Sequence, residues 1–344
     1  MANLVVNLGK IVENIGVIRS LCEQSALDLV VVTKCFGPND IILDRVVKSG
    51  VRQVAESHPV NYRAVNGNAV RHSLLCSVSG VKRMAHCDVV YLTERDTLRA
   101  LSNSPLASRC RVVIPVEAGD CREGVPAEEL VPFLEYALSL DGIDIAGFSA
   151  NFCCFTLSAP DRKAVERFLG DISAACAAID FRPDIVSVGG SSLWRLLAED
   201  DLPPEINQIR IGEAIFLGRD PARDEVIPSL HQDAFLLEGE ILELRRKESP
   251  IPETRIAEGE DAAPPPPFEG TRAVLDMGHT TCSSADLTPL APGIRIVGAT
   301  QDHTVVRLEG GPYAVGDKIA FSLNYRSLTR ANISPYLNRV YIEE

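Results

Sequence analysis

Apolar residues recur along the first two thirds of the chain in short runs, separated by stretches with helical spacing. Eight such runs follow one another, at residues 28–34, 51–55, 72–76, 88–92, 111–117, 143–150, 184–188 and 206–211. Helices are predicted between several of them, at 95–102, 128–140 and 161–179. Eight strand-then-helix units within about 200 residues predict an α/β fold built on a closed (β/α)8 barrel, the TIM barrel. An open doubly wound sheet is the competing architecture, and it normally has fewer strands.

The pattern differs at the two ends of the chain. A short apolar strand is predicted at 4–6, followed by a helix at 11–27. Beyond residue 230, short strand-like runs recur without long helices, at 237–244, 271–277, 294–299, 304–308, 318–323 and 338–342. A charged, proline-rich segment near 246–270 interrupts them, and we expect it to be a mobile insertion. The sequence therefore predicts a barrel domain at 1–228 and a smaller, mostly β domain at 229–344.

Composition narrows the class of function. The chain has 344 residues, and its 46% hydrophobic content is enough to fill a large core. A net charge of −13 argues against nucleic-acid binding, which requires clustered Lys and Arg. No apolar run approaches the roughly 18 residues of a membrane span, and the first residues lack the pattern of a signal peptide. The ten cysteines show no CxxC pair. We expect a cytoplasmic protein with reduced thiols and no membrane partner.

One lysine stands at a position suited to chemistry. Lys34 comes directly after the apolar run at 28–33, and Gly37 follows three residues later. The ends of strands in parallel α/β folds are where active sites lie. A lysine beside an apolar floor loses its proton more readily than a solvated lysine, and its amine then attacks an aldehyde. Lys34 is therefore a candidate nucleophile for a Schiff base, although a lysine after a strand is also commonly just the first residue of a loop.

Other predicted strand ends carry polar or glycine-rich turns. The segment 117–124 places Arg122 in a turn flanked by glycines, and Asn151 follows the run at 143–150. The segment SVGGSS, residues 187–192, leads into a short predicted helix. Free backbone N–H groups and hydroxyls at such a turn suit a phosphate, and phosphate sites after strands seven and eight recur in TIM barrels.

Taken together, these segments resemble the family of alanine racemases of fold type III, which depend on pyridoxal 5'-phosphate (PLP), and most closely its ornithine racemase-like branch. The resemblance runs almost from end to end. Its most specific segments are VVTKCFG (31–37), AESHPVN (55–61), GDCREGV (119–125), NFCCF (151–155), SVGGSS (187–192), INQIRIGEAIFLGRD (206–220), IPSLHQDAF (227–235), VGATQDH (297–303) and LNYRSLTRANISPY (323–336).

The resemblance implies PLP as cofactor and assigns residues to it. Lys34 would form the internal aldimine and act as one acid/base. The phosphate would be held by Ser191 and by the backbone of Gly190, Arg210, Ile211 and Gly212. Arg122 matches an arginine near the phenolic oxygen of the cofactor, and Asn151 matches a residue packed against its ring.

Arg210 matches the arginine that faces the ring nitrogen. A permanent cation there keeps this nitrogen unprotonated, which favours quick return of a proton to Cα over transamination or elimination. Fold type III decarboxylases place a carboxylate at the ring nitrogen instead. If Glu213 rather than Arg210 turned inward, racemisation would be less favoured.

Racemisation needs a second acid/base on the opposite face of Cα. In alanine racemases this is a tyrosine of the β domain, contributed across a dimer interface. Here the matching segment, LDMGHTTC at 275–282, has His279 in that place, and histidine titrates near neutral pH. His279 is our candidate, and an edge histidine with a purely structural hydrogen bond is the alternative. Gln301, Asp302 and His303 match a loop that meets the substrate carboxylate. Tyr325 and Tyr336 are reserve candidates for the missing phenol, and Tyr325 is also a substrate-binding candidate.

The resemblance thus implies a racemase that interconverts L- and D-amino acids through an external aldimine, by removal and return of the Cα proton, in a homodimer. Ornithine is the implied substrate, with alanine, serine or lysine as alternatives. A basic side chain would need a carboxylate, for which Glu56, Asp276 and Asp302 are candidates. Other functions remain open: a decarboxylase, a metal-assisted aldolase or dehydratase with zinc on His279, Cys282 and His303, or a non-catalytic PLP carrier. We expect no metal, and the carrier alternative leaves the β domain without a purpose.

Overall fold

The computed structural model describes residues 1–58, 61, 69–84, 87–249 and 268–343, without the side chains of Ser249 and Phe268. The chain forms two compact units. One contains Ile11–Gln232, and the other combines Met1–Lys10 with Asp233–Glu344. No helix among the described residues is both long and apolar enough to cross a membrane.

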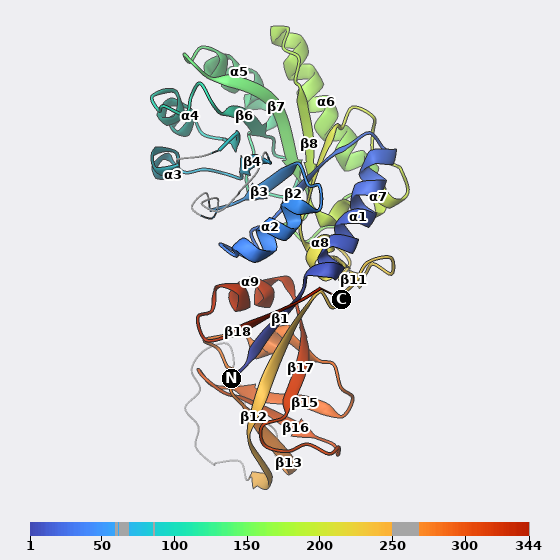
Figure 1. Cartoon of the computed structure of the whole chain (residues 1–344). Coiled ribbons are helices and arrows are strands. Elements are labelled where there is room, and N and C mark those ends of the chain that lie inside the picture. Colours follow the sequence, from blue (N-terminus) through green and yellow to red (C-terminus); the bar gives the residue numbers. More distant parts are fainter. Residues whose placement is uncertain (59–60, 62–68, 85–86, 250–267, 344) are drawn as a thin grey trace. The chain divides into compact units, whose positions relative to one another are not determined.

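The first unit is a closed parallel barrel, which confirms the predicted fold (Figure 1). Each of the eight predicted runs overlaps one strand of the barrel. The strands are β2 (Asp28–Val32), β3 (Gln53–Glu56), β4 (Val70–Ser73), β5 (Val89–Tyr91), β6 (Arg111–Pro115), β7 (Asp144–Asn151), β8 (Ile185–Gly189) and β9 (Gln208–Ile211). The barrel closes because β9 pairs in parallel with β2, with Ile211 opposite Val31.

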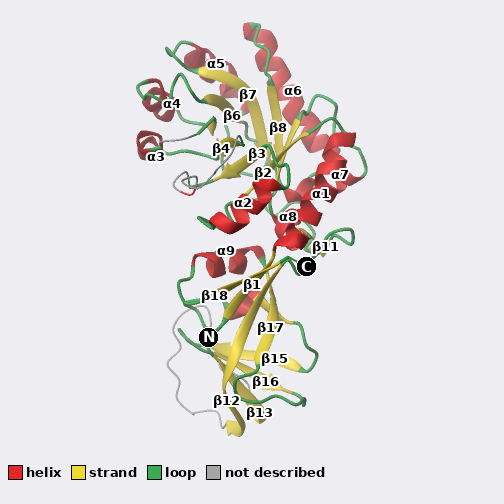
Figure 2. Cartoon of the chain, viewed as in Figure 1, coloured by secondary structure: helices red, strands yellow, loops and turns green. Residues whose placement is uncertain are grey.

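Helices accompany the barrel strands (Figure 2). They are α1 (Leu8–Gln24), α2 (Asp40–Lys48), α3 (Val78–Arg83), α4 (Arg95–Ser102), α5 (Leu130–Leu138), α6 (Arg162–Ile179), α7 (Trp194–Ala198) and α8 (Glu213–Leu217), with 3-10 turns at Ala127–Glu129 and Ser191–Leu193. Local sequence sets where they begin. Asn39 accepts a hydrogen bond from the Ile42 N–H at the start of α2, and Asp161 accepts one from the Ala164 N–H at the start of α6.

The second unit is a mainly antiparallel sheet with the strand order β14-β17-β12-β13-β16-β15. The bounds of these elements are β12 (Phe235–Ser249), β13 (Phe268–Leu275), β14 (Leu287–Pro289), β15 (Ile294–Ala299), β16 (Thr304–Leu308), β17 (Lys318–Leu323) and β18 (Asn338–Ile342). The predicted mostly β domain is confirmed. It also contains one helix that the pattern did not predict, α9 (Tyr325–Ile333), which begins where the Asn324 side chain accepts a hydrogen bond from the Ser327 N–H.

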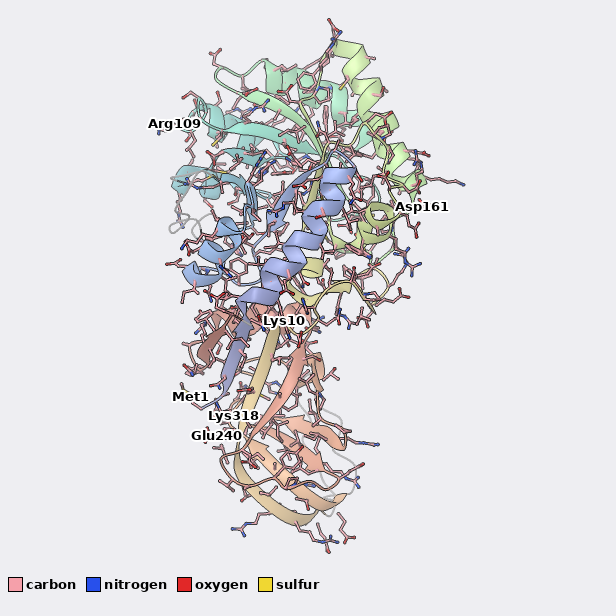
Figure 3. All side chains as sticks on the ribbon, turned by 45° about the vertical axis from the view of Figure 1, so that its right-hand side comes forward. Met1, Lys10, Arg109, Asp161, Glu240 and Lys318 are labelled. Carbon is pink, nitrogen blue, oxygen red and sulfur yellow. The ribbon has the colours of Figure 1, made fainter. Side chains whose placement is uncertain are left out.

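The division of the chain differs from the predicted boundaries in its first residues. Strand β1 (Asn3–Asn7) pairs with β12 and β18, so Met1–Lys10 belong to the β unit rather than to the barrel. The terminal amine of Met1 also lies 2.6 Å from a carboxylate oxygen of Glu240 on β12, and Figure 3 labels both residues. The alternation of residues in a strand does not identify the strand with which it pairs. Residues 250–267, the main part of the predicted insertion, lie outside the described residues.

Candidate active site

The barrel places Lys34 at the carboxyl edge of its strands. β2 ends at Val32, and the side chain of Lys34, in the turn that follows, is half-buried. The N–H of Thr33 donates to the Ala55 carbonyl at 2.8 Å, which extends the β2–β3 ladder by one residue toward this turn. Phe36 packs edge-on against Phe216 of α8, with ring centroids 5.3 Å apart. The turn is therefore fixed on both sides of the lysine.

Glu213 lies on the neighbouring strand end, two residues after the end of β9. Burial raises the pKa of its carboxyl group to about 7, against the opposing effect of the positive charges of Arg219 and Lys34. Glu213 is the first residue of α8 and does not lie inside the barrel strand.

Arg210 is a buried cation in the barrel. Only 4% of its surface is exposed. Its Nη1 donates to the Ser187 hydroxyl at 2.7 Å, and its Nη2 donates to the Ala150 carbonyl at 2.9 Å and to Asn151 Oδ1 at 3.1 Å. Its guanidinium lies over the Tyr91 ring, 5.4 Å from the centroid. The Arg210 side chain therefore turns inward.

The buried polar groups continue from Arg210 across the barrel. The Tyr91 hydroxyl lies 3.1 Å from His72 Nδ1, and Nε2 of the same histidine lies 2.8 Å from Gln53 Oε1. Burial, reinforced by the positive charge of Arg210, lowers the pKa of His72 to about 3, so this histidine is neutral.

Gly189, the last residue of β8, has no side chain, and Arg210 occupies the space where a side chain would lie. A Cβ atom at position 189 would lie 2.6 Å from Arg210 Nη2 and 2.7 Å from Asn151 Oδ1. Gly190 and the turn at Ser191–Leu193 follow. The buried Ser191 hydroxyl accepts a hydrogen bond from the Ala214 N–H at 2.9 Å, which joins this turn to the segment after β9. The two turns assigned to a phosphate, at Gly190 and Ser191 and at 210–212, thus lie side by side.

Arg122 lies in the loop after β6 and is paired with a residue that sequence reasoning missed. Its guanidinium donates two hydrogen bonds to the neighbouring Glu123, one of them from Nη2 at 2.5 Å. Asn151 Nδ2 donates to the same carboxylate at 2.6 Å. The only signal in the sequence was the position of Glu123, a charge directly after the predicted Arg122.

His279 and the loop at 300–303 meet in the β unit. The N–H of His279 donates to the Thr300 carbonyl at 3.0 Å, and the N–H of Thr280 donates to the Gln301 carbonyl at 2.9 Å. Gly278 permits this approach, since a Cβ there would lie 2.4 Å from the Thr300 oxygen. The two predicted segments of the β domain are therefore adjacent.

The remaining candidates of the β unit occupy different settings. Tyr325 is the first residue of α9, and Tyr336 is largely exposed. Cys282 is buried, which raises the pKa of its thiol to about 12. Among the described residues, no three His, Cys, Asp or Glu side chains are grouped as ligands of a metal ion, and this includes His279, Cys282 and His303.

Comparison with known proteins places the chain in a family. A family model described as the alanine racemase N-terminal domain matches residues 6–220. The chain belongs to the alanine racemase family. It is 30% identical to an ornithine racemase of Acetoanaerobium sticklandii and 28% identical to a lysine racemase of Thermotoga maritima, in each case over 98% of both chains. The predicted family is confirmed, and these two relatives are isomerases of the predicted class.

Solved structures share the fold of this alanine racemase family member. An alanine racemase of Clostridium difficile 630 matches with a TM-score of 0.75 at 17% identity, over 100% of this chain and 96% of that chain. A D-threonine aldolase of Filomicrobium marinum matches with a TM-score of 0.72 at 17% identity, over 96% and 89%. Proteins with different reactions therefore share this architecture, and the residues of the site must decide between them.

Proposed function

We propose that the protein is a PLP-dependent amino-acid racemase acting on a basic amino acid, ornithine or lysine. The two relatives that align over nearly the whole chain act on these amino acids according to their names. The observation that carries the proposal is the inward position of Arg210, buried at the end of β9 beside the β2 strand end that bears Lys34. A buried guanidinium is suited to proton return at Cα rather than to reactions that need a strong electron sink.

The residues present fit PLP. Lys34 supplies an amine at the carboxyl edge of the barrel, where ligands of this fold bind. The turns at 190–192 and 210–212 converge through the Ser191–Ala214 hydrogen bond and bring backbone N–H groups to one place, as a phosphate requires. A Cβ at Gly190 would meet only the Arg210 carbonyl oxygen, at 3.8 Å, so the space beside this turn is open. When bound, PLP would delocalise the negative charge that forms at Cα.

Side chains of this protein would transfer the proton at Cα and orient the cofactor. Lys34 Nζ would take the proton from one face of Cα and return it there in the reverse direction. Arg210 would face the ring nitrogen and disfavour a proton on it, because two cations in a buried pocket repel each other. Its hydrogen bonds to Ser187, Ala150 and Asn151 hold the guanidinium in one orientation. Arg122 would offer positive charge near the phenolic oxygen.

We assign the second proton site to His279, whose imidazole would serve the opposite face of Cα. Its backbone is fixed against Thr300, and the adjoining Gln301 and Asp302 would meet the substrate carboxylate. The chain would act as a homodimer in which the β domain of one protomer completes the site of the other. A fully active monomer would contradict this arrangement.

The test is a screen of the common L-amino acids plus ornithine in deuterated water, read by chiral chromatography and by deuterium at Cα. We expect deuterium in both enantiomers of ornithine or lysine for the wild type. The PLP-reconstituted wild type should also show a visible absorbance band that Lys34→Ala lacks. A colourless wild type, or no deuterium with any amino acid, would refute the proposal.

His279→Ala is the discriminating variant of this screen. If His279 serves one face of Cα, the variant should exchange deuterium into one enantiomer of the substrate while losing racemisation at least 100-fold. An unchanged racemisation rate would reassign the second proton site, with Tyr325 and Tyr336 as the next candidates.

A further inference from the structure

Arg210 is a buried cation without a direct counter-charge. Within the described part of the chain, its hydrogen-bond partners are a hydroxyl, a carbonyl and an amide oxygen, and it forms no ion pair. Burying an unpaired charge is costly, so a compensating carboxylate is expected close by.

Asn151 connects Arg210 to such a carboxylate. Its Oδ1 accepts from Arg210 Nη2 at 3.1 Å, while its Nδ2 donates to Glu123 Oε1 at 2.6 Å. The amide thus presents its oxygen to the cation and its nitrogen to the anion, which aligns its dipole between the two charges. Burial alone would raise the pKa of the Glu123 carboxyl, but the hydrogen bonds and positive charge of Arg122, the hydrogen bond from Asn151 and, last, the positive charge of Arg210 hold it below its usual value.

The same carboxylate also binds Arg122. Glu123 accepts two hydrogen bonds from this guanidinium, and only 9% of its side chain is exposed. The buried carboxylate of Asp120 also lies near Arg122: its Oδ2 is 4.0 Å from Nε, and its Oδ1 accepts hydrogen bonds from the N–H groups of Phe155 and Thr156. Asp120 is thus engaged in holding the loop after β7, and Glu123 is the carboxylate that reaches both arginines.

We propose that Glu123 is a positioning residue that serves as the shared counter-charge of Arg122 and Arg210, acting on Arg122 directly and on Arg210 through Asn151. This inference rests on the proposed function, because both arginines are assigned there to the cofactor. Glu123 fixes the orientation of Arg122 and limits how much net positive charge the two arginines present. The charged groups that act on Glu123 are Arg122 on its own loop and Arg210 on β9, whereas Asp120 on the same loop and Cys154 after β7 act on Arg122.

The test is the pH at which the PLP-reconstituted protein loses half of its visible absorbance band. A protonated, cationic linkage between Lys34 and PLP gives this band, and a nearby negative charge stabilises it. Removing the charge of Glu123 in Glu123→Gln should therefore lower the midpoint, by about one pH unit for a largely buried charge. Glu117→Gln is the matched control. Glu117 lies in the same loop and accepts from the N–H groups of Gly119 and Cys121 rather than from an arginine, so its midpoint should stay at the wild-type value.

A second variant separates charge compensation from a structural role. Arg122→Gln with Glu123→Gln removes both members of the pair at constant net charge, so its midpoint should return to within about 0.3 pH units of wild type. This double variant also tests the proposal if Glu123→Gln alone does not fold. If Glu123 were only structural, Glu123→Gln would leave the midpoint unmoved and the double variant would raise it, because a cation alone would have been lost; either result overturns the inference. A wild type without a visible band would remove the proposed function and this inference together, whereas a normal band with an unmoved midpoint removes only the inference.

Discussion

Replacing Gly189 by alanine would test how tightly the end of β8 packs against Arg210. The added Cβ would lie 2.6 Å from Arg210 Nη2, 3.1 Å from its Cζ and 2.7 Å from Asn151 Oδ1. Favourable contacts lie at about 3.5–4.0 Å, so the guanidinium or the amide must move by about 1 Å. Arg210 is held by hydrogen bonds to Ser187 and Ala150 and lies over the Tyr91 ring, so a displacement of its guanidinium weakens these contacts.

The expected cost has two parts. Overpacking a filled interior costs about 1–3 kcal/mol. Displacing Arg210 also weakens hydrogen bonds to a charged donor, each of which contributes about 1.5–3 kcal/mol. Because the displacement weakens these bonds without removing them, we expect Gly189→Ala to lower the free energy of unfolding of the barrel by about 2–4 kcal/mol.

Trp194 provides the assay. It is the single tryptophan of the chain and lies in α7 of the barrel unit, so its fluorescence during urea unfolding reports on the barrel. Gly170→Ala in α6 is the matched control. A Cβ there meets no atom within 4 Å, so this change should raise stability by up to about 1 kcal/mol. A Gly189→Ala protein whose free energy of unfolding is within about 0.5 kcal/mol of wild type would show that Arg210 is not held in place as described.

Two further outcomes can be measured with the same fluorescence signal. The pKa of Glu213 is raised to about 7 in the folded protein. Between about pH 4.5 and 7 the folded state therefore binds a proton more tightly than the unfolded state. The contribution of this group to stability falls as the pH rises through that window. The free energy of unfolding of Glu213→Gln should therefore rise relative to that of wild type as the pH rises, by up to about 3 kcal/mol. Parallel pH profiles of the two proteins would contradict the burial of this carboxyl. Asp161→Ala removes the side chain that accepts a hydrogen bond from the Ala164 N–H at 2.8 Å and should lower the free energy of unfolding by about 1 kcal/mol. Asp161→Asn keeps an acceptor and should lower it by less. Equal losses in the two variants would show that the helix cap does not act through this hydrogen bond.

The sequence by itself determined the barrel, the β domain and the position of Lys34. Most barrel strands lie in short apolar runs, and the ordered series of eight leaves few architectures open. Lys34 could be predicted because it directly follows such a run, and the ends of parallel strands share one edge of the barrel. These features depend on local patterns that a single sequence displays.

Tertiary structure alone decided which distant groups meet. The run at Leu4–Val6 predicts a strand, but its partners β12 and β18 lie more than 200 residues away, and nothing local distinguishes them from barrel strands. Gln208 and Arg210 alternate with Ile209 and Ile211 along β9, and only closure of the barrel shows that Arg210 faces the interior. Glu123 resembles an ordinary surface charge until Asn151, brought from β7, connects it to Arg210. Periodicity assigns a side chain to one of two faces, whereas charge compensation depends on distances that only the folded chain sets.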